Sequence, residues 1–292
     1  MIKYIVSNPK RYLKHTTMPV FNKYVFFNLQ YLDTIKDENL FFKAIHQVRL
    51  ANGIYKTTKA KRFVDIDTQL TALLKPGVIY KIHDVAASDG ITSVDLYNTL
   101  KAAGINLELH MSDKFSVIYC EKKWYGALYK DADAAVLYAD FFSIQASRYI
   151  ISRRYILSRL LGFLFPQKSP LKPTDKEVHM LNPKTRSLIN EGKISFSYYD
   201  IFEVHANAEE YDVVRCMNVL NHNVFADETI VQGALNLVST IKENGFFIIG
   251  RTEENTGQNR VTIFRKKQNE LELVININDG SEVKNLLING KR

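Results

Sequence analysis

The sequence has little of what marks secreted, membrane-spanning or low-complexity chains. It contains only two cysteines, seven prolines and thirteen glycines. Cys120 and Cys216 lie in apolar segments without the spacing of a metal site or a disulfide, which favours buried thiols. No apolar run approaches the roughly 20 residues that cross a bilayer, and residues 1–6 lack the continuous apolar core of a signal peptide. We therefore expect a protein of the cytoplasm.

The chain does contain enough apolar sequence for a large core, together with an excess of positive charge. Of its 292 residues, 46% are hydrophobic, and the formal net charge is +8. This composition is typical of a globular protein with one large domain or two smaller ones. The charge favours an acidic partner, such as anionic lipid, nucleic acid or a carboxylate-bearing protein.

The stretch 78–96 is the part of the chain around which we expect the rest to be organised. Residues 78–85 are apolar and β-branched, which predicts a buried strand. The small residues of 86–90 then form a turn, and a helix is expected from near Thr92. Such a turn lets a ligand approach the backbone and face the free N–H groups of the first helical turn. An ordinary connection between a strand and a helix fits the same pattern.

A second strand is expected at 107–111, and it is followed by Asp113. This aspartate comes roughly 20 positions after Gly90, where nucleotide-binding α/β units place an acid that binds ribose hydroxyls. A helix cap is the alternative role for Asp113. Further along the chain the pattern predicts a helix at 183–190, strands at 194–199, 211–220 and 246–249, a helix at 227–242, and a closing antiparallel hairpin over 260–265 and 271–277.

The interval from 115 to 192 departs from a regular alternation of strands and helices. Two or three short strands are expected between 115 and 142. Residues Ile144 to Phe165 predict a helix in which four arginines are mixed with aliphatic and aromatic side chains. A helix of this composition can lie on an anionic membrane surface. Because the arginines do not share one helical face, it can equally pack on a sheet with its arginines at the rim.

Five segments, taken in order, resemble the motifs of one enzyme family. The chain from Val78 to about Ile277 resembles the class I S-adenosylmethionine-dependent methyltransferases, and is most similar to the branch of the chemotaxis-receptor carboxyl methyltransferases. The segments that carry the resemblance are Asp84–Gly90, Ser112–Asp113, Tyr199–Phe202, Asp212–Leu220 and Asn244–Ile249. One departure is that Ala86 and Ser88 stand where the family's loop has its first two glycines, which narrows the approach to the cofactor.

The resemblance implies an α/β fold with a Rossmann-like sheet, mostly parallel and with antiparallel edge strands. It further implies a methyltransferase domain over 75–292 preceded by an N-terminal helical region over 1–74. The insertion at about 115–192, together with the N-terminal region, would form a cap that selects the substrate.

The cofactor implied by the resemblance is S-adenosylmethionine. Asp84 would lie near its amino group, Asp113 at the ribose hydroxyls, and Asp200 with its two successors beside the adenine. The full set of implied cofactor-binding residues is Asp84, Ala86, Ala87, Ser88, Gly90, Asp113, Asp200, Ile201, Phe202 and Asn218.

The residues expected to act on the methyl acceptor are Arg215, Asn218 and His222. Methyl transfer from a sulfonium is an in-line displacement that depends on alignment, so neither a metal nor a covalent intermediate is required. Arg215 could hold an acceptor carboxylate bidentately, and His222 could take a proton from an acceptor hydroxyl. A surface role for His222 and a strand-end cap role for Asn218 fit the sequence equally well.

Three functions remain open from the sequence. The first is O-methylation of a small-molecule, lipid-like or protein carboxylate, with the basic surface attracting an acidic acceptor and the segment Ile144 to Phe165 contacting anionic membrane. The second is RNA methylation, which the charge also favours. It is less favoured because the segment 212–220 lacks the Asn/Asp-Pro-Pro-Tyr sequence of many base-methylating enzymes. The third is a binding module that keeps the fold without catalysis.

Overall fold

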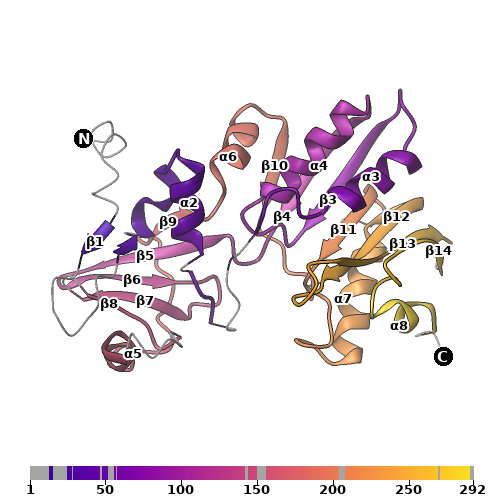
Figure 1. Ribbon diagram of the computed structural model, residues 1–292. Coiled ribbons are helices and arrows are strands. Elements are labelled where there is room, and N and C mark those ends of the chain that lie inside the picture. The colour runs from indigo at the N-terminus through magenta and orange to yellow at the C-terminus, as the bar shows by residue number, and fades with distance from the viewer. Residues whose placement is uncertain are drawn as a thin grey trace. The chain divides into compact units, whose positions relative to one another are not determined.

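The computed structural model describes two compact units, each treated below by itself (Figure 1). Unit 1 combines 1–58 with 115–186, and unit 2 combines 59–114 with 187–292. The residues that the structure describes are 13–15, 25–27, 29–46, 48–51, 56, 58–141, 144–149, 156–203, 208–268 and 270–289. Both units are therefore discontinuous in sequence. A methyltransferase domain over 75–292 with an insertion at about 115–192 stays a prediction.

Unit 2 is built on a seven-stranded sheet of mixed direction. Its strands lie in the order β10-β4-β3-β11-β12-β13-β14. The first five are parallel to one another, and β13 and β14 are antiparallel to their neighbours. The strands are β3 (Ile79–Val85), β4 (Asn106–Ser112), β10 (Ile194–Ser197), β11 (Tyr211–Met217), β12 (Ile241–Thr252), β13 (Asn259–Lys267) and β14 (Glu270–Ile277). The predicted α/β sheet and its closing antiparallel hairpin are confirmed.

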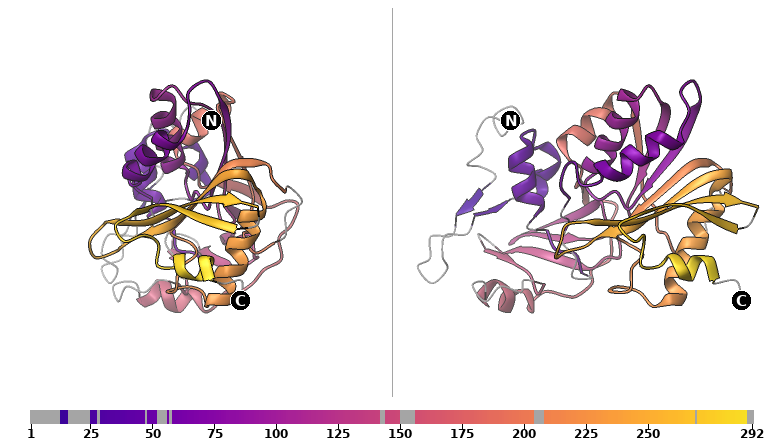
Figure 2. Two further views of the ribbon diagram at one scale, coloured as in Figure 1. Left: turned by 90° about the vertical axis from the view of Figure 1, so that its right-hand side faces the viewer. Right: turned by 45° about the vertical axis from the view of Figure 1, so that its right-hand side comes forward.

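Helices cover both faces of this sheet, as Figure 2 shows. Alternate strand residues point to opposite faces. On one face, Val214 and Cys216 pack in a core with α7 (Asp227–Ser239). On the other face, the intervening Arg215 meets α3 (Val64–Leu73) and α4 (Ile91–Ala102). Unit 2 ends with the short helix α8 (Lys284–Asn289).

Unit 1 contains an antiparallel five-stranded sheet with the order β8-β7-β6-β5-β9. A buried cluster joins its inner face to α2 and η2, so the N-terminal residues and the later strands share one core. The elements are β1 (Leu13–His15), β2 (Val25–Phe27), η2 (Leu29–Thr34), α2 (Glu38–Ile45), β5 (Val117–Lys123), β6 (Gly126–Lys130), β7 (Val136–Phe141), β8 (Ile144–Ala146), α5 (Ile156–Gly162), β9 (Lys176–His179) and α6 (Pro183–Asn190), whose last residues belong to unit 2.

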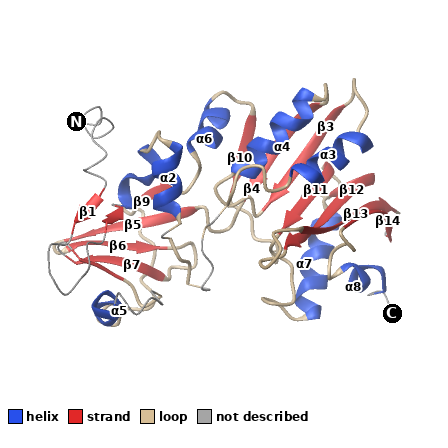
Figure 3. Ribbon diagram, viewed as in Figure 1, coloured by secondary structure: helices blue, strands red, loops and turns tan. Residues whose placement is uncertain are grey.

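One expectation about secondary structure is corrected (Figure 3). Ile144 to Phe165 is not one helix. Its first residues form β8, which pairs antiparallel with β7, and helical structure is described only over α5. The N-terminal region, expected to be mainly helical and irregular, contains η2, α2 and α3 together with the paired strands β1 and β2, and α3 belongs to unit 2. At β8, pairing with β7 overrides local helix propensity.

Both cysteines are buried and free, as the sequence predicts. Among the residues that the structure describes, no helix combines the length and the apolar character needed to cross a membrane.

Candidate functional site at the carboxyl ends of the parallel strands

The strand order of unit 2 creates a switch point between β3 and β11. The chain goes from β3 outward to β4 and β10 on one side, and from β11 to β12 on the other. Numbered in chain order, the strands of unit 2 follow the sequence 3-2-1-4-5-6-7. In open α/β sheets with this arrangement, ligands bind outside the carboxyl ends of the strands where the order reverses. The loops after β3, β4, β10 and β11 are therefore the place to look for a site.

The loop after β3 has a backbone conformation that glycine would adopt most easily. Ala86 has φ of 56° and Ser88 has φ of 58°, and both are in the left-handed region. Gly90, with φ of 81°, is the N-cap of α4 and has no side chain to cap it, but the buried Asp89 accepts a hydrogen bond from the N–H of Ile91 at 3.1 Å. Residues other than glycine rarely adopt this conformation, and such strain clusters at functional sites. The loop is thus a small-residue bend that leads into a helix N-terminus at which Asp89 holds the N–H of Ile91.

Asp113 lies against this loop. Its Oδ2 accepts a hydrogen bond from the backbone N–H of Ser88 at 2.9 Å, and the side chain is buried. Two main-chain bonds secure the arrangement: the N–H of Ala87 donates to the carbonyl of Ser112, and that of Asp113 donates to the carbonyl of Ser197. The predicted cofactor loop and the predicted ribose acid are therefore brought together at the ends of β3, β4 and β10.

The segment predicted to lie beside the adenine is joined to the same place. Asp200 forms an ion pair with Lys114 at 2.9 Å and accepts a hydrogen bond from the N–H of Phe202. Ile201 is buried in the cluster that also contains Val85 at the end of β3. The ring of Phe202 is partly exposed and packs edge-on to Phe225. An exposed aromatic ring beside a carboxylate offers both stacking and a hydrogen-bond acceptor to a base.

Arg215 is placed differently from its predicted role. Its side chain is wholly buried, and its Nε and Nη2 hold the carboxylate of Asp84 bidentately at 2.8 and 2.6 Å. Its Nη1 donates to Asp67 at 2.7 Å, and Nη2 also donates to the carbonyl of Thr92. The bidentate contact expected for an acceptor carboxylate is thus made within the protein, and Asp84, which also accepts from Ser93, faces Arg215.

Burial and charge act in opposite directions in this group. Burial raises the pKa of Asp67 to about 7, although the charge of Arg215 opposes the shift. Burial would lower the pKa of Arg215, but the charges of Asp84 and Asp67 outweigh it and raise the value. The guanidinium therefore stays charged. It ties β11 to β3 and to helix α3 directly behind the loop.

Asn218 and His222 are also held by contacts within the protein. Asn218 has a left-handed backbone with φ of 63°, and its Oδ1 accepts a hydrogen bond from the N–H of Thr252 at 2.7 Å. His222 is exposed; its Nδ1 lies 3.1 Å from Asp227, and its N–H donates to Glu282. These contacts hold the segment after β11 against the end of β12 and the start of α7. They do not join either side chain to Asp113.

Sequence reasoning missed several residues that shape the site. Asp67 lies 148 positions before Arg215, and a buried acid in an expected helix gave no sign of that pairing. His83, buried on the opposite face of β3, contacts the hydroxyl of Ser112 through Nε2 at 2.7 Å. His110, next to it on β4, contacts the hydroxyls of Ser195 and Ser197, and burial lowers its pKa. These pairs fix the ends of β4 and β10 under the loop.

The residues present fit S-adenosylmethionine in their chemistry. Carboxylate oxygens such as those of Asp113 accept hydrogen bonds from vicinal hydroxyls, and main-chain N–H groups at a helix N-terminus bind a carboxylate. The half-buried Ala86 and Ser88 carry only small side chains, which leaves the backbone approachable.

Comparisons with known proteins give no family and no curated relative: no family model and no curated protein matches the chain. Among solved structures it is similar to the methyltransferase domain of the citrinin polyketide synthase, with 12% identity, 65% of this chain and 34% of that chain covered, and a TM-score of 0.32.

The chain is also similar to the solved structures of two further proteins. Phosphoethanolamine N-methyltransferase 1 of Haemonchus contortus, solved with phosphoethanolamine and S-adenosylhomocysteine, is 11% identical, with 85% and 34% covered and a TM-score of 0.34. A protein of Pyrococcus horikoshii OT3 is 13% identical, with 77% and 78% covered and a TM-score of 0.36. The chain spans about a third of the length of the two methyltransferases named.

Proposed function

We propose that unit 2 binds S-adenosylmethionine at the carboxyl ends of β3, β4 and β10 and transfers its methyl group to an acceptor. The observation that carries this proposal is the hydrogen bond from Ser88 to Asp113, which joins a left-handed small-residue loop to a strand-end acid at the switch point. The order of sequence motifs along the chain supports the same cofactor.

Each binding role follows from the chemistry of the side chain. Asp113 would accept hydrogen bonds from the ribose hydroxyls while it keeps the loop in place. The main-chain N–H groups at the start of α4 would face the cofactor's carboxylate. The adenine would lie beside Asp200 and against the partly exposed ring of Phe202, since Ile201 is buried in the core. Asp84 and Arg215 would act from behind, by fixing the strands that bear the loop.

The bound sulfonium supplies an electrophilic methyl group, so the chain needs no nucleophile of its own. The protein's part is to hold the cofactor and acceptor in line and to keep water away. A backbone strained in advance serves this purpose, because it does not have to be ordered when the cofactor binds.

For the acceptor we propose oxygen of a carboxylate on a small-molecule, lipid-like or protein substrate. The net charge of +8 supports an acidic acceptor, and the segment 212–220 supports the chemotaxis-receptor branch through its Arg, Asn and Val-Leu. Because Arg215 is enclosed by Asp84 and Asp67, recognition of the acceptor falls to other basic side chains. RNA is the second candidate acceptor, favoured by the same charge.

Calorimetric titration with S-adenosylmethionine and S-adenosylhomocysteine tests the cofactor assignment. The wild-type chain should bind, and Asp113→Asn, which keeps the shape but removes the charge, should bind about tenfold more weakly or worse. Asp279→Asn is the matched control, because it changes an exposed aspartate in unit 2 and should leave affinity unchanged.

Two results would overturn parts of the proposal. If the protein does not bind the cofactor at millimolar concentration, it shares the fold of these enzymes without their catalysis. Equal affinity of Asp113→Asn and wild type would show that the ribose assignment is wrong. If binding holds, labelled methyl groups followed from the cofactor into cell extract, fractionated into lipid, protein and RNA, identify the acceptor class.

A further inference from the structure

Unit 1 exposes large apolar side chains on and around α5. Leu160 is 58% exposed, Phe163 59% and Leu164 75%, and Trp124, in the turn between β5 and β6, is 85% exposed. A single exposed leucine on a protein surface is ordinary, but clusters of this kind mark interaction sites. We call these four residues the aromatic patch.

Ring contacts connect Trp124 with the end of α5. The indole lies edge-on to Tyr125 with ring centroids 5.5 Å apart, and Tyr125 lies 5.7 Å from Phe165, the residue after Leu164. Phe141 on β7 contacts both rings. The half-buried Tyr125, Phe141 and Phe165 thus form the base from which the exposed residues project.

The C-terminal end of α5 is held against the sheet. Arg148 donates hydrogen bonds to the carbonyls of Gly162 and Phe165, and its guanidinium lies 5.7 Å from the ring of Phe163. A side chain at Gly162 would come within 2.4 Å of the backbone N of Arg148. This close packing prevents α5 from rotating about its axis, so Phe163 and Leu164 remain exposed.

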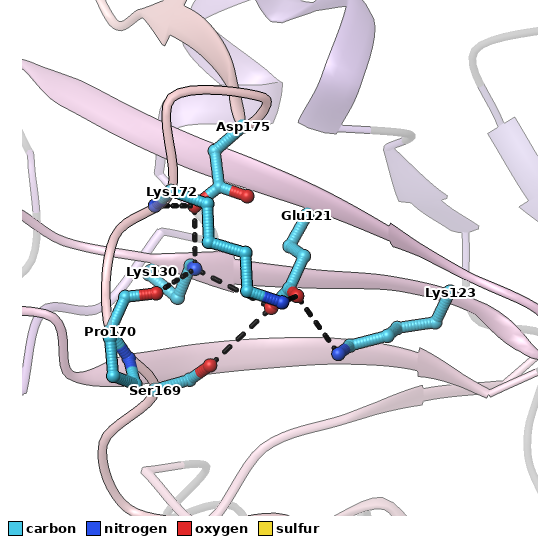
Figure 4. A network of polar contacts seen from close by, with 7 residues as sticks. All are labelled: Glu121, Lys123, Lys130, Ser169, Pro170, Lys172 and Asp175. Carbon is cyan, nitrogen blue, oxygen red and sulfur yellow. Dashed lines mark hydrogen bonds and ion pairs between the residues drawn. The ribbon is translucent and has the colours of Figure 1, made fainter.

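The loop that follows is fixed by the polar network in Figure 4. Lys130, fully buried, donates to the carbonyl of Pro170 at 2.8 Å and to Asp175 at 2.6 Å. Glu121 accepts from Ser169 and Lys172. Because Lys130 and Glu121 come from strands, this network attaches the loop to the sheet, and the patch is bounded on both sides by fixed structure.

The sequence of α5 and its flanking segments carries charge of one sign, although the exposed Asp133 lies on a turn that pairs with the loop after α5. From Phe141 to Thr174 the sequence has no acidic residue, and its basic residues are Arg148, Arg153, Arg154, Arg159, Lys168 and Lys172. Arg159 lies beside Leu160 in α5, Lys168 follows the helix, and Lys122 precedes Trp124; all three are exposed. Long basic side chains can place their stems on an apolar surface and their charges among anionic headgroups.

We propose that the aromatic patch is a membrane-surface site that inserts between the headgroups of an anionic lipid bilayer. Tryptophan, phenylalanine and leucine flanked by lysine and arginine are the composition of interfacial anchors. An acidic protein partner would also meet the positive charge, but the aromatic and aliphatic side chains project from the fixed helix end, as insertion into headgroups requires. This inference does not depend on methyl transfer.

The single tryptophan of the chain makes the proposal directly testable. With vesicles of phosphatidylcholine and phosphatidylserine, the emission of Trp124 should shift to the blue as its exposed indole enters the interface. The protein should float with these vesicles and not with phosphatidylcholine alone. Binding should weaken when salt is raised from about 0.05 to 0.5 M, because salt screens the attraction of exposed charges.

Two sets of variants separate apolar from electrostatic contributions. Phe163→Ser with Leu164→Ser should abolish flotation while circular dichroism stays unchanged, since both side chains are already exposed. Replacement of Lys122, Arg159 and Lys168 by Gln should weaken binding by about a factor of five for each charge removed.

Matched substitutions in unit 2 serve as controls. Leu235→Ser removes an exposed leucine of α7, and the replacement of Lys59, Lys75 and Lys101 by Gln removes three exposed lysines. Both should float as the wild type does. The proposal is wrong if wild type ignores anionic vesicles, if it floats equally with neutral ones, or if the Phe163 and Leu164 variant binds normally; a pull-down by acidic proteins alone would then identify a protein-binding surface.

Discussion

Each unit contains a buried cation that lies between two carboxylates, and the two groups have different roles. In unit 2, Arg215 and its partners Asp67 and Asp84 have side chains between 0% and 4% exposed. In unit 1, Lys130 is equally buried, but Glu121 also receives the half-exposed Lys172 and Lys123. The planar guanidinium joins two strands and a helix into one frame, whereas the ammonium attaches a loop to a sheet. The Arg215 group is closed, meaning that all its members are buried, and it supports the candidate site. The Glu121 group is open, because it includes partly exposed lysines, and it shapes a surface.

Arg215→Met should cause the largest loss in the free energy of unfolding. This change leaves the carboxylates of Asp84 and Asp67 buried without their cation, which costs about 3 to 5 kcal/mol in such sites. Urea unfolding followed by far-ultraviolet circular dichroism should show this loss. Arg215→Lys keeps the charge but not the bidentate contact, so its loss should be intermediate. A loss below about 1 kcal/mol for Arg215→Met would mean that the group is not closed.

Lys130→Met should have the next largest effect. Asp175 would lose the buried cation that pairs with it, but Glu121 would keep Lys123 and Lys172, so we expect a loss of roughly 2 to 3 kcal/mol. Although burial would raise it, hydrogen bonds from Lys172 and Lys123 hold the pKa of Glu121 at about 2. Far-ultraviolet circular dichroism in urea measures this loss, because the exposed indole of Trp124 changes its surroundings little on unfolding. Lys172→Gln is the control, and a loss as large as that of Lys130→Met would contradict the difference drawn here.

Asp67→Asn should change how the free energy of unfolding depends on pH. Because burial raises the pKa of Asp67 to about 7 in the folded state, protonation stabilises the fold below pH 4, and this stability is lost as pH rises towards 7. The variant does not titrate there. The free energy of unfolding of the variant minus that of wild type should therefore increase between pH 4 and pH 7 and then level off. A difference that is constant over this range would show that Asp67 is ionised throughout.

Ala86→Gly should have the smallest effect and the opposite sign. Glycine adopts φ of 56° without the left-handed penalty of roughly 1 to 2 kcal/mol that alanine incurs. Part of this gain is lost, because glycine also gives the unfolded chain more conformational entropy. We expect a gain of up to about 1 kcal/mol in the free energy of unfolding. Ala103→Gly, at the end of α4 with a negative φ, is the comparison and should not stabilise. A destabilised Ala86→Gly would mean that the loop is not strained.

The sequence predicts the frame of unit 2 well and the contacts of its charged residues poorly. Val78 to Leu96 gave the strand, turn and helix because local periodicity and small residues decide them. The role of Arg215 could not be foreseen, since its partner Asp67 is distant in sequence and on a helix with no distinguishing pattern. Ile144 to Phe165 was misread because apolar residues with arginines suit a strand at a sheet edge as well as a helix.

The discontinuity of unit 2 has a consequence for how the chain is made. β4 and β10 pair in parallel, yet the whole later part of unit 1 is synthesised between them. Every residue of unit 1 leaves the ribosome before β10 does, so unit 1 can fold first and bring the two flanking ends together. Closure of that long loop then costs less entropy, and translation order becomes part of how β10 comes to pair with β4.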